Sequence, residues 1–487
     1  MPKIPGIRSN RIAAGLVAVL LVGGCAVGPD FQRPAPASGA GYVKTPLAPV
    51  EAGGVAQRFE AGADLPGQWW TLYQSPALNR LVGEALKANP DLAAAQAALR
   101  SAHETYLAQR GAFLPTVDLG GNVSREKASG ALSPPLSSSL LLFDLYNTQV
   151  NVGYTPDVFG GIRRQTEAVA AQAQAQRFAT EATYLTLTSN LVTAAIQAAG
   201  LREQITAAES AIKDESDVLA LMRRQRELGQ ASGGDVAAQE ALLAQAEQAL
   251  PPLRKQLAQT EDQIAALTGR SPAEAEDVLI GLDDLTLPAA LPVSLPAKLV
   301  EQRPDVRIAE ANLHAASANV GVAIAARLPN LTLSASAGGS STHIGSLLTQ
   351  PNSFWTIGAG LAQPIFEGGA LYHRQKAAEA SFDQAKAQYR STVISAMQNV
   401  ADSLQALSAD ADALKAAERA EASAAASLAI ARRQLEVGDA SRVAVLNAEQ
   451  THLQALISRA QARVNRYADT AALFEALGGG WWNRTET

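Results

Sequence analysis

Few side chains in this 487-residue chain have the types and the spacing that catalysis or metal binding requires. The histidines lack the short ligand spacing of zinc sites; they are His103, His314, His343, His373 and His452. The sequence contains no glycine-rich phosphate loop after a strand pattern and no nucleophile elbow. It therefore predicts a protein that is not an enzyme, with no cofactor and no metal site.

The single cysteine, Cys25, is the residue with the most evident covalent chemistry. One cysteine excludes an intrachain disulfide. Before it lie three basic residues within positions 1–11, a short apolar run over positions 12–22, and the small residues Gly23 and Gly24. The apolar run is well short of the ~20 residues of a transmembrane helix. Residues 1–24 are therefore predicted to be a secretory leader.

A lone cysteine directly after such a leader resembles the lipobox of bacterial lipoproteins, although Val22 stands where leucine is commoner. The resemblance implies that the Cys25 thiol is lipidated and that Cys25 becomes the new N-terminus. Ala26 follows instead of the aspartate that retains lipoproteins in the inner membrane, which favours the outer membrane. The alternative is an ordinary secretory leader with an incidental cysteine.

Composition narrows the remaining function classes. The formal net charge is −6, and no basic patch suggests a nucleic-acid partner. No segment after the leader has the pattern of a transmembrane helix. Residues 25–68 are rich in Pro, Gly and Ala, which predicts an extended tether from the lipid anchor without a core of its own.

The chain contains an internal duplication. Three patterns recur in the same order: 89–92 returns as 303–306 and Leu114-Pro115 as Leu328-Pro329, both 214 positions on, and 223–229 returns as 432–438, 209 positions on. Recurrence in order and at nearly constant spacing indicates two copies of one unit with loops of unequal length. We expect the first repeat at 69–285 and the second at 286–481, followed by a tail over 482–487.

Much of each repeat has the periodicity of long helices. Apolar residues alternate steps of three and four over positions 201–222, 243–267 and 397–414, which predicts helices that pack as coiled coils. Pro251-Pro252 lie inside the second run. We expect a kink or a break there, because proline removes a hydrogen bond and clashes with the preceding turn. The simplest alternative is a rod-like coiled coil.

In four places the periodicity switches to two: 117–124 and 150–155 in the first repeat, 331–337 and 355–361 in the second. Each segment has one apolar and one polar face and is about as long as a transmembrane β-strand. Each repeat therefore contributes one hairpin, at about 113–158 and about 328–366, with polar loops over 129–139 and 338–352. A half-buried soluble sheet has the same periodicity and is the alternative.

Four strands cannot cross a membrane alone, because lipid cannot pair with the open edges of a sheet. The smallest membrane barrels have about eight strands, so closure requires several copies of the chain. A homotrimer would close a 12-stranded β-barrel and an α-barrel of helices. The expected fold class is mainly α with a small transmembrane β part. Leu331, Leu333, Trp355 and Ile357 are expected to face lipid, and Thr332, Ser334, Thr356 and Gly358 the lumen.

Several motifs are spread over the predicted mature chain. They are Cys25–Asp30, Trp69-Trp70, Asn89–Leu92, Leu291–Pro296 with Gln302–Val306, Asp157–Gly161 with Arg163-Arg164, Pro364–Gly369, and Ala476–Trp481. These motifs resemble those of the TolC-like outer membrane efflux protein family, in particular its NodT/OprM-type lipoprotein branch. The resemblance covers essentially the mature chain.

The resemblance implies a trimeric outer-membrane duct, with a short β-barrel that continues as a long helical barrel into the periplasm. It implies the exit channel of a tripartite efflux pump that exports small molecules such as drugs or toxic compounds. The partners would be a periplasmic adaptor (membrane fusion) protein and an inner-membrane transporter, usually proton-driven. Two alternatives stay open: an outer-membrane duct for protein secretion, and a lipid-anchored periplasmic coiled-coil scaffold or adaptor. The four alternating segments argue against a scaffold.

Two equivalent turns between helical runs are the candidate partner contacts. The first contains Leu228, Gly229 and Ser232, and the second Val437, Gly438 and Ser441. Glycine after a helix tolerates a positive φ, and Ser232 with Asp235 predicts a capping box. The resemblance adds contact with the adaptor at these turns.

Charged residues beside the turns are candidate gate residues. In many relatives a Tyr-Arg pair precedes the second glycine and an Asp lies nine residues after it. This chain has Leu435, Glu436 and Asn447 at those places, so that network cannot be transferred. The local candidates for gate charges are Asp235, Glu436, Asp439 and Arg442. The alternative is that these groups are solvated or capping charges.

Overall fold

The computed structural model describes residues 26–35, 41–44, 49–52, 55–127, 142–274 and 279–484. The predicted leader, Cys25 and the predicted loop over 129–139 lie outside these residues. The chain divides into two compact units. Unit 1 comprises Met1–Arg33, Arg100–Ala175 and Ala309–Tyr389, and unit 2 comprises Pro34–Leu99, Gln176–Ile308 and Arg390–Thr487. Within the described residues, no helix combines the length and the apolar character needed to cross a membrane.

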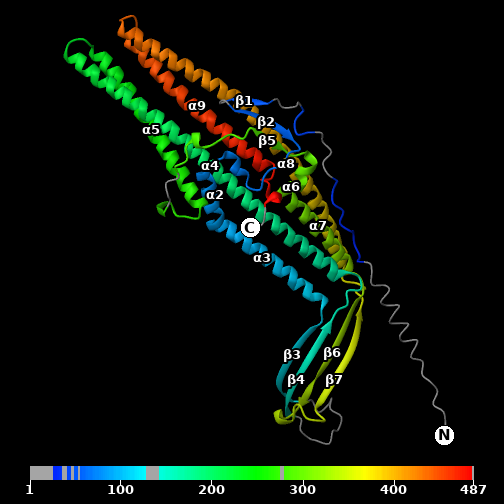
Figure 1. Cartoon of the computed structure of the whole chain (residues 1–487). Coiled ribbons are helices and arrows are strands. Elements are labelled where there is room, and N and C mark those ends of the chain that lie inside the picture. The colour runs from blue at the N-terminus through cyan, green and yellow to red at the C-terminus, as the bar shows by residue number, and fades with distance from the viewer. Residues whose placement is uncertain are drawn as a thin grey trace, which may run out of the picture. The chain divides into compact units, whose positions relative to one another are not determined.

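The duplication is visible in the order and length of the elements (Figure 1). The first repeat contains α2 (Pro76–Ala88), α3 (Pro90–Arg110), β3 (Thr116–Lys127), β4 (Leu142–Tyr154), α4 (Gly161–Glu227) and α5 (Gly233–Leu267). The second contains α6 (Pro296–Gln302), α7 (Pro304–Ala325), β6 (Asn330–Ser341), β7 (Ser353–Ala362), α8 (Ala370–Glu436) and α9 (Arg442–Ala476). Helices α4 and α8 both have 67 residues, and α5 and α9 both have 35. The predicted repeats therefore fold alike, element by element.

Short 3-10 turns connect these elements: η1 (Trp69–Tyr73), η2 (Gly111–Phe113), η3 (Pro272–Glu274), η4 (Leu282–Asp284), η5 (Ile344–Ser346) and η6 (Trp481–Asn483).

Unit 1 contains a four-stranded antiparallel sheet in the order β3-β4-β6-β7, so each repeat supplies one hairpin, as predicted. The strands are longer than the alternating pattern indicated. Strand β4 begins at Leu142, and β6 continues through Gly338 and Gly339 to Ser341. These two glycines look like loop residues in the sequence, but a Cβ on Gly338 would lie 2.1 Å from the carbonyl oxygen of Thr148. They are small because a neighbouring backbone passes close to them.

Unit 2 contains a second, small sheet that the sequence did not predict. Strand β2 (Val55–Ala61) pairs with β1 (Val50–Ala52) and, in parallel, with β5 (Ala290–Val293). The Gln57 side chain is buried and donates to the carbonyl of Pro288 at 3.1 Å. Part of the predicted tether over 25–68 therefore pairs with the body of unit 2. Its alternation is short and its partner strand lies more than 200 residues away, which local periodicity cannot reveal.

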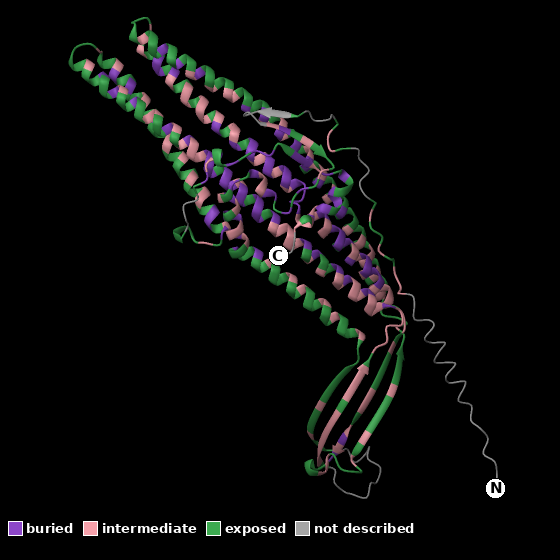
Figure 2. Ribbon diagram, in the orientation of Figure 1, coloured by how far each residue is buried: buried purple, intermediate pink, exposed green. Residues whose placement is uncertain are grey.

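Motif residues near both ends of the duplicated region contribute to the core of unit 2, whose buried residues are purple in Figure 2. Trp69 and Phe474 are fully buried, with ring centroids 5.8 Å apart. The Tyr73 hydroxyl donates to the carbonyl of Tyr467 at 2.8 Å. The Trp481 indole donates to the carbonyl of Gln302 at 2.6 Å. Both ends of the duplicated region thus pack together, and aromatic burial dominates the energetics of such a junction.

Helix α5 is continuous through Pro251 and Pro252, so a break at these residues is not observed. Ion pairs to α4 lie on both sides of the prolines. The Arg223 guanidinium lies 2.8 Å from Glu240, before the prolines, and the Arg254 guanidinium lies 2.7 Å from Glu209, after them. Packing against a long neighbouring helix compensates for the hydrogen bonds that the two prolines cannot form.

Candidate functional sites in the strand sheet, the N-terminal strap and the hairpin turns

The register of the sheet in unit 1 gathers apolar side chains on one face. Two rows cross the four strands: Val117, Val152, Ala335 and Ile357 form one, and Leu119, Val150, Ala337 and Trp355 form the other. The largest of these side chains are exposed in the single chain; Leu119 is 78% and Trp355 74% accessible. An exposed apolar face of this kind is typical of a surface that contacts another apolar surface or an apolar medium.

The opposite face of the same sheet is polar. Asp118, Asn151, Ser336 and Thr356 pair in one continuous row across the four strands. Side chains alternate strictly along a strand, so one register assigns every residue to its face. The predicted division of the strand residues into an apolar and a polar set is therefore confirmed. Which medium each face meets is a proposal.

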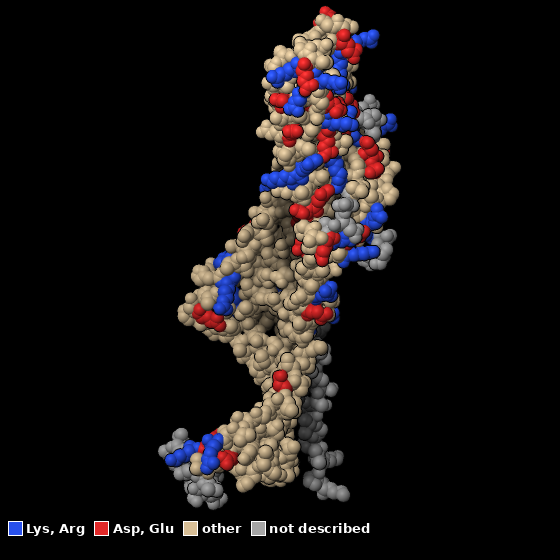
Figure 3. All heavy atoms as spheres, turned by 90° about the vertical axis from the view of Figure 1, so that its left-hand side faces the viewer, with Lys and Arg blue, Asp and Glu red and all other residues tan. Residues whose placement is uncertain are grey.

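Charges in this sheet are concentrated near the end where β3 stops and β4 starts (Figure 3). Arg125 pairs directly with Asp144 in the register, and their charged groups lie 3.8 Å apart. Glu126 and Lys127 follow on β3. The middle of the apolar face carries no charged residue, so the sheet has a neutral band bounded by a charged end.

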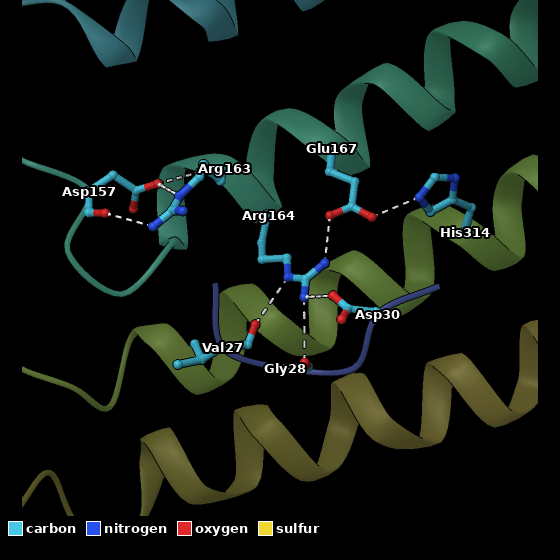
Figure 4. Close-up of polar contacts among 8 residues, drawn as sticks. All are labelled: Val27, Gly28, Asp30, Asp157, Arg163, Arg164, Glu167 and His314. Atoms are coloured by element: carbon cyan, nitrogen blue, oxygen red, sulfur yellow. Dashed lines mark hydrogen bonds and ion pairs between the residues drawn. The ribbon is translucent and has the colours of Figure 1, made fainter. Parts of the chain in front are cut away.

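The start of α4 in unit 1 is fixed by Asp157 (Figure 4). Its carboxylate accepts hydrogen bonds from the backbone N–H groups of Ile162 at 2.9 Å and Arg163 at 2.8 Å. The Arg163 side chain donates to the same carboxylate at 3.2 Å. A carboxylate that satisfies the unpaired donors of a helix N-terminus stabilises it. The Asp157–Gly161 motif thus has a local structural role.

Residues 26–31, which we call the N-terminal strap, are held against α4 and α7 in unit 1 (Figure 4). The Arg164 guanidinium donates to the carbonyl of Val27 at 3.1 Å, to Asp30 at 2.6 Å and to Glu167 at 2.8 Å. The Arg164 side chain is only 6% exposed. Burial opposes its charge, but the carboxylates of Asp30 and Glu167 outweigh this and raise the pKa of Arg164.

Further contacts close the strap. Glu167 also lies 2.8 Å from the His314 ring nitrogen, and Phe31 stacks on that ring with centroids 4.3 Å apart. A Cβ on Gly28, which has φ +94°, would lie 2.4 Å from the Cα of Gly321. The strap therefore packs closely on α7 at Gly28, and this part of the predicted tether lies against the helices of unit 1. Sequence reasoning singled out both motifs but could not show that they meet.

The two hairpin turns in unit 2 have the predicted geometry. Gly229 and Gly438 have φ values of 75° and 78°. The N–H of Gln230 donates to the carbonyl of Gln225 at 2.8 Å, and that of Asp439 to Gln434 at 2.8 Å. Both turns thus satisfy the last helical carbonyls in the same way, with glycine in the left-handed region.

The caps that start the following helices differ between the turns. Ser232 and Asp235 form the predicted reciprocal capping box, with the Asp235 N–H donating to the Ser232 hydroxyl at 3.1 Å. Hydrogen bonds from the side chain and backbone of Ser232 lower the pKa of Asp235, with a smaller contribution from Arg442. Ser441 accepts only from the N–H of Ala444, at 3.3 Å. The second turn therefore has a cap without an acidic partner.

The structure separates the candidate contact and gate residues. Leu228 and Val437 are exposed, at 67% and 74%, and lie where a partner could reach them. Leu435 instead packs against the apolar cluster of Leu428, Ala431, Val445 and Ala448 inside the second hairpin. Glu436, Asp439 and Asn447 are exposed. The ion pairs found among the described residues do not include one between Arg442 and Asp439 or Glu436; the charge of Arg442 acts on Asp235.

Comparison with known proteins identifies the family. A profile of the family described as "Outer membrane efflux protein" matches residues 81–270 and 295–479. The chain belongs to the outer membrane efflux protein family. It is 29% identical over 421 residues to the pyoverdine export outer membrane protein OpmQ of Pseudomonas putida, covering 86% of this chain and 89% of that protein. It is 28% identical over 470 residues to the toluene efflux pump outer membrane protein TtgF of Pseudomonas putida, covering 94% and 95%.

Solved structures of two outer-membrane proteins have the same fold. The outer-membrane channel OprN aligns with a TM-score of 0.83 and 27% identity, over 94% of this chain and all of that chain. The outer membrane protein VceC of Vibrio cholerae aligns with a TM-score of 0.78 and 26% identity, over 86% of this chain and all of that chain. The predicted mainly α fold with a small β part is therefore confirmed, as are the outer-membrane location and the efflux function.

Within this efflux protein, the duplication also repeats an ion pair that sequence reasoning missed. The Arg223 guanidinium lies 2.8 Å from Glu240, and the Arg432 guanidinium lies 2.8 Å from Glu449. The two pairs are 209 positions apart in both residues. The recurrence of the arginines was visible in the sequence, and a search for acids at the same offset would have found their partners.

Proposed function

We propose that this chain is the exit duct of a tripartite efflux pump and that it works as a homotrimer. The four-stranded sheet with one apolar and one polar face carries the proposal. Its outer strands β3 and β7 each have one unpaired flank within the described sheet, and three copies joined at these edges would close a 12-stranded barrel. The apolar rows would then face lipid, and the polar row with Asp118, Asn151, Ser336 and Thr356 would line the lumen.

We infer that Cys25 carries a lipid that anchors the chain in the outer membrane. The N-terminal strap supports this assignment, because it holds the residues directly after Cys25 against the same unit that contains the strands. Cys25→Ser should abolish labelling with a radioactive lipid precursor, while trimers still form because their closure rests on the strands. Labelling that persists in Cys25→Ser would contradict the assignment.

We also infer that the two hairpin turns bind the periplasmic adaptor. Leu228 and Val437 present apolar surface at equivalent places, and Gly229, Ser232, Gly438 and Ser441 fix the shape of the turns. The inner-membrane transporter of the pump, which we take to be proton-driven, would supply the energy. Asp235 and Asp439 would each form a ring of three carboxylates by threefold symmetry, in which the like charges repel one another and attract cations. Glu436 and Arg442 are the other candidate gate charges.

The oligomeric state and the export activity test this function together. We expect the detergent-extracted protein to have three times the mass of one chain by native mass spectrometry. Deletion of the gene should increase the susceptibility of the cell to a panel of drugs and solvents, and the full chain should restore resistance. A monomeric extracted protein, or a deletion strain with unchanged susceptibility to every compound, would contradict the proposal.

A further inference from the structure

A cavity of about 430 Å³ lies in unit 2 between the hairpin α4/α5 and the hairpin α8/α9. Alanine and leucine side chains from the four helices supply most of its apolar lining. Charged side chains are gathered in one part of its wall: Asp214 and Glu215 on α4, Arg432 on α8, and Glu449 on α9. Among these residues, Arg432 and Asp214 form an ion pair at 3.8 Å between the two hairpins, which are green and orange to red in Figure 1.

Arg432 is bound by carboxylates from two helices. Its guanidinium donates to the Glu449 carboxylate at 2.8 and 3.2 Å, and it lies 3.8 Å from Asp214. The Glu449 side chain is only 8% exposed. Its second oxygen, Oε2, is buried and has no hydrogen-bond partner within the described part of the chain. A buried carboxylate oxygen without a donor is costly, so this atom requires a proton donor.

Glu215 is the group that can supply this proton. The Gln239 amide on α5 donates to the backbone carbonyl of Glu215 at 3.1 Å and also to its carboxylate. Burial, followed by the charge of Glu449, raises the pKa of Glu215 from 4.5 to about 7. A protonated Glu215 is a hydroxyl donor facing Glu449, and one shared proton satisfies both carboxyl groups.

We propose that Glu215 and Glu449 share a proton that holds α4 against α9, so that the spacing of the two hairpins depends on pH. We call this contact the carboxyl clasp. It goes beyond the export function proposed above, because it describes a motion of the chain whatever the chain transports. It requires only the four helices of unit 2.

The charges that face the clasp set the direction of its pH dependence. When Glu215 is ionised, three carboxylates (Asp214, Glu215 and Glu449) share the single positive charge of Arg432. His452, one turn after Glu449 on α9, also lines the cavity. Repulsion among the carboxylates then favours separation of the hairpins.

The direction of the pH dependence follows from the linkage between proton binding and closure of the clasp. The closed clasp binds a proton that Glu215 in separated hairpins would release above pH 4.5. The closed arrangement is therefore most stable at low pH, weakens as the pH rises from 4.5 to about 7, and changes little above that. Within this window, the ratio of closed to open molecules should fall by up to about tenfold per pH unit.

Distance measurements between spin labels on the two turns test the clasp. Cys25 is the only cysteine, so Cys25→Ser leaves engineered cysteines as the only thiols. Ala231→Cys and Ala440→Cys place one label in each turn at equivalent positions. Full-length labelled chain would be diluted with unlabelled chain in detergent. Double electron–electron resonance spectroscopy then reports the distance between the two labels within one chain. We expect a short, narrow distribution at about pH 5 and a longer one at about pH 8.

Two substitutions decide the cause of any shift. Glu215→Gln replaces the carboxyl with an amide that donates at every pH, so the short distance should persist at high pH. Asp410→Asn is the matched control. Burial and a hydrogen bond with Asp469 also raise the pKa of Asp410 to about 7, but this pair joins α8 to α9 within one hairpin. Asp410→Asn should therefore keep the pH response of the parent chain.

Three results would overturn the clasp. The first is a parent chain whose distances do not change between the two pH values. The second is a shift that survives in Glu215→Gln, and the third is a shift that disappears in Asp410→Asn, because another titrating group would then control the hairpins. These distances do not depend on conduction or export, so failure of the clasp and failure of the proposed function are distinguishable.

Discussion

The hairpins α4/α5 and α8/α9 are two copies of one design placed in different surroundings. Their helices have equal lengths, their turns have the same glycine geometry, and each contains an arginine–glutamate pair at 2.8 Å. In the first hairpin Arg223 and Glu240 are 60% and 48% exposed. In the second, Glu449 is 8% exposed and its arginine also meets Asp214 of the first hairpin. The duplication thus copied local structure, and tertiary packing buried the glutamate of only one of these two pairs.

The strands show the opposite relation between the repeats. Strands β3 and β6 have the same length, and equivalent residues such as Leu119 and Leu333 lie on the same face of one sheet. In the sheet the two copies have the same environment, whereas the arginine–glutamate pairs of the two hairpins differ in burial. Substitutions at matched positions in the two repeats should therefore have equal effects in the strands and at the turn glycines, and unequal effects at the arginine–glutamate pairs of the hairpins.

The largest effect is expected for arginine on the apolar face of the sheet. Leu119→Arg and Leu333→Arg should each destabilise the assembled protein by ~2–4 kcal/mol if this face meets the middle of the bilayer. Asp118→Arg and Thr332→Arg on the polar face are the controls, and they should change permeation with little loss of assembly. The yield of extracted trimer measures the effect. Equal losses on both faces, or a clear difference between Leu119 and Leu333, would contradict the equivalence of the strands.

Removal of the glutamate from each ion pair should show that the hairpins differ. Glu449→Ala removes an 8% exposed carboxylate that accepts two hydrogen bonds from Arg432, and it should lower the free energy of unfolding by about 1–3 kcal/mol. Glu240→Ala breaks an exposed pair and should cost less than about 1 kcal/mol. Urea unfolding of the extracted protein, followed by circular dichroism, compares the two variants. Equal costs would mean that the burial of Glu449 has no energetic consequence.

The turn glycines should behave alike in both hairpins. Gly229→Ala and Gly438→Ala place a Cβ on a residue with positive φ, which should cost about 1 kcal/mol in each turn. The glycines have no neighbouring atom within 4 Å of such a Cβ, so backbone strain is the whole effect. The same unfolding experiment measures both variants. In cells, Gly438→Ala should weaken adaptor-dependent efflux, and a turn that tolerates alanine at no cost would refute the role of backbone strain.

The smallest effects on stability are expected for the exposed charges of the turns. Asp439→Ala and Arg442→Ala should leave unfolding nearly unchanged, because surface charges contribute little. Each should nevertheless raise single-channel conductance in planar bilayers if these residues form a ring at the entrance. Unchanged conductance and unchanged cation selectivity in both variants would make them simple surface charges. The gate would then lie elsewhere in the hairpins.

The parts of the fold that the sequence predicted correctly depend on local patterns. Alternation assigned Leu331 and Ile357 to one face, and the pair Ser232 and Asp235 announced a helix cap. These features need only the spacing of neighbouring residues along a strand or a helix turn. The continuity of α5 through Pro251 shows the limit of such rules, because packing against α4 outweighs the local preference of proline.

The features that the sequence did not predict depend on contacts between distant segments. The Gln57 side chain donates to the carbonyl of Pro288, and the Arg164 side chain donates to the carbonyl of Val27. A carboxylate such as Glu449 looks like any solvated helix charge until α4 covers it. Nothing in the local spacing distinguishes it from Glu240, its counterpart in the first repeat.

The two outer strands of the sheet differ in charge, and this difference affects the newly synthesised chain before it assembles. Strand β3 carries Asp118, Arg125, Glu126 and Lys127, whereas β7 (Ser353–Ala362) contains no charged residue. Charges on an edge strand discourage pairing with wrong partners, and a neutral edge rich in bulky side chains invites it. In the unassembled chain, β7 is therefore more prone to aggregate than β3. Assembly therefore depends on whether β7 pairs with a second copy of the chain faster than it pairs with other proteins. Periplasmic chaperones that bind the unassembled chain should favour assembly.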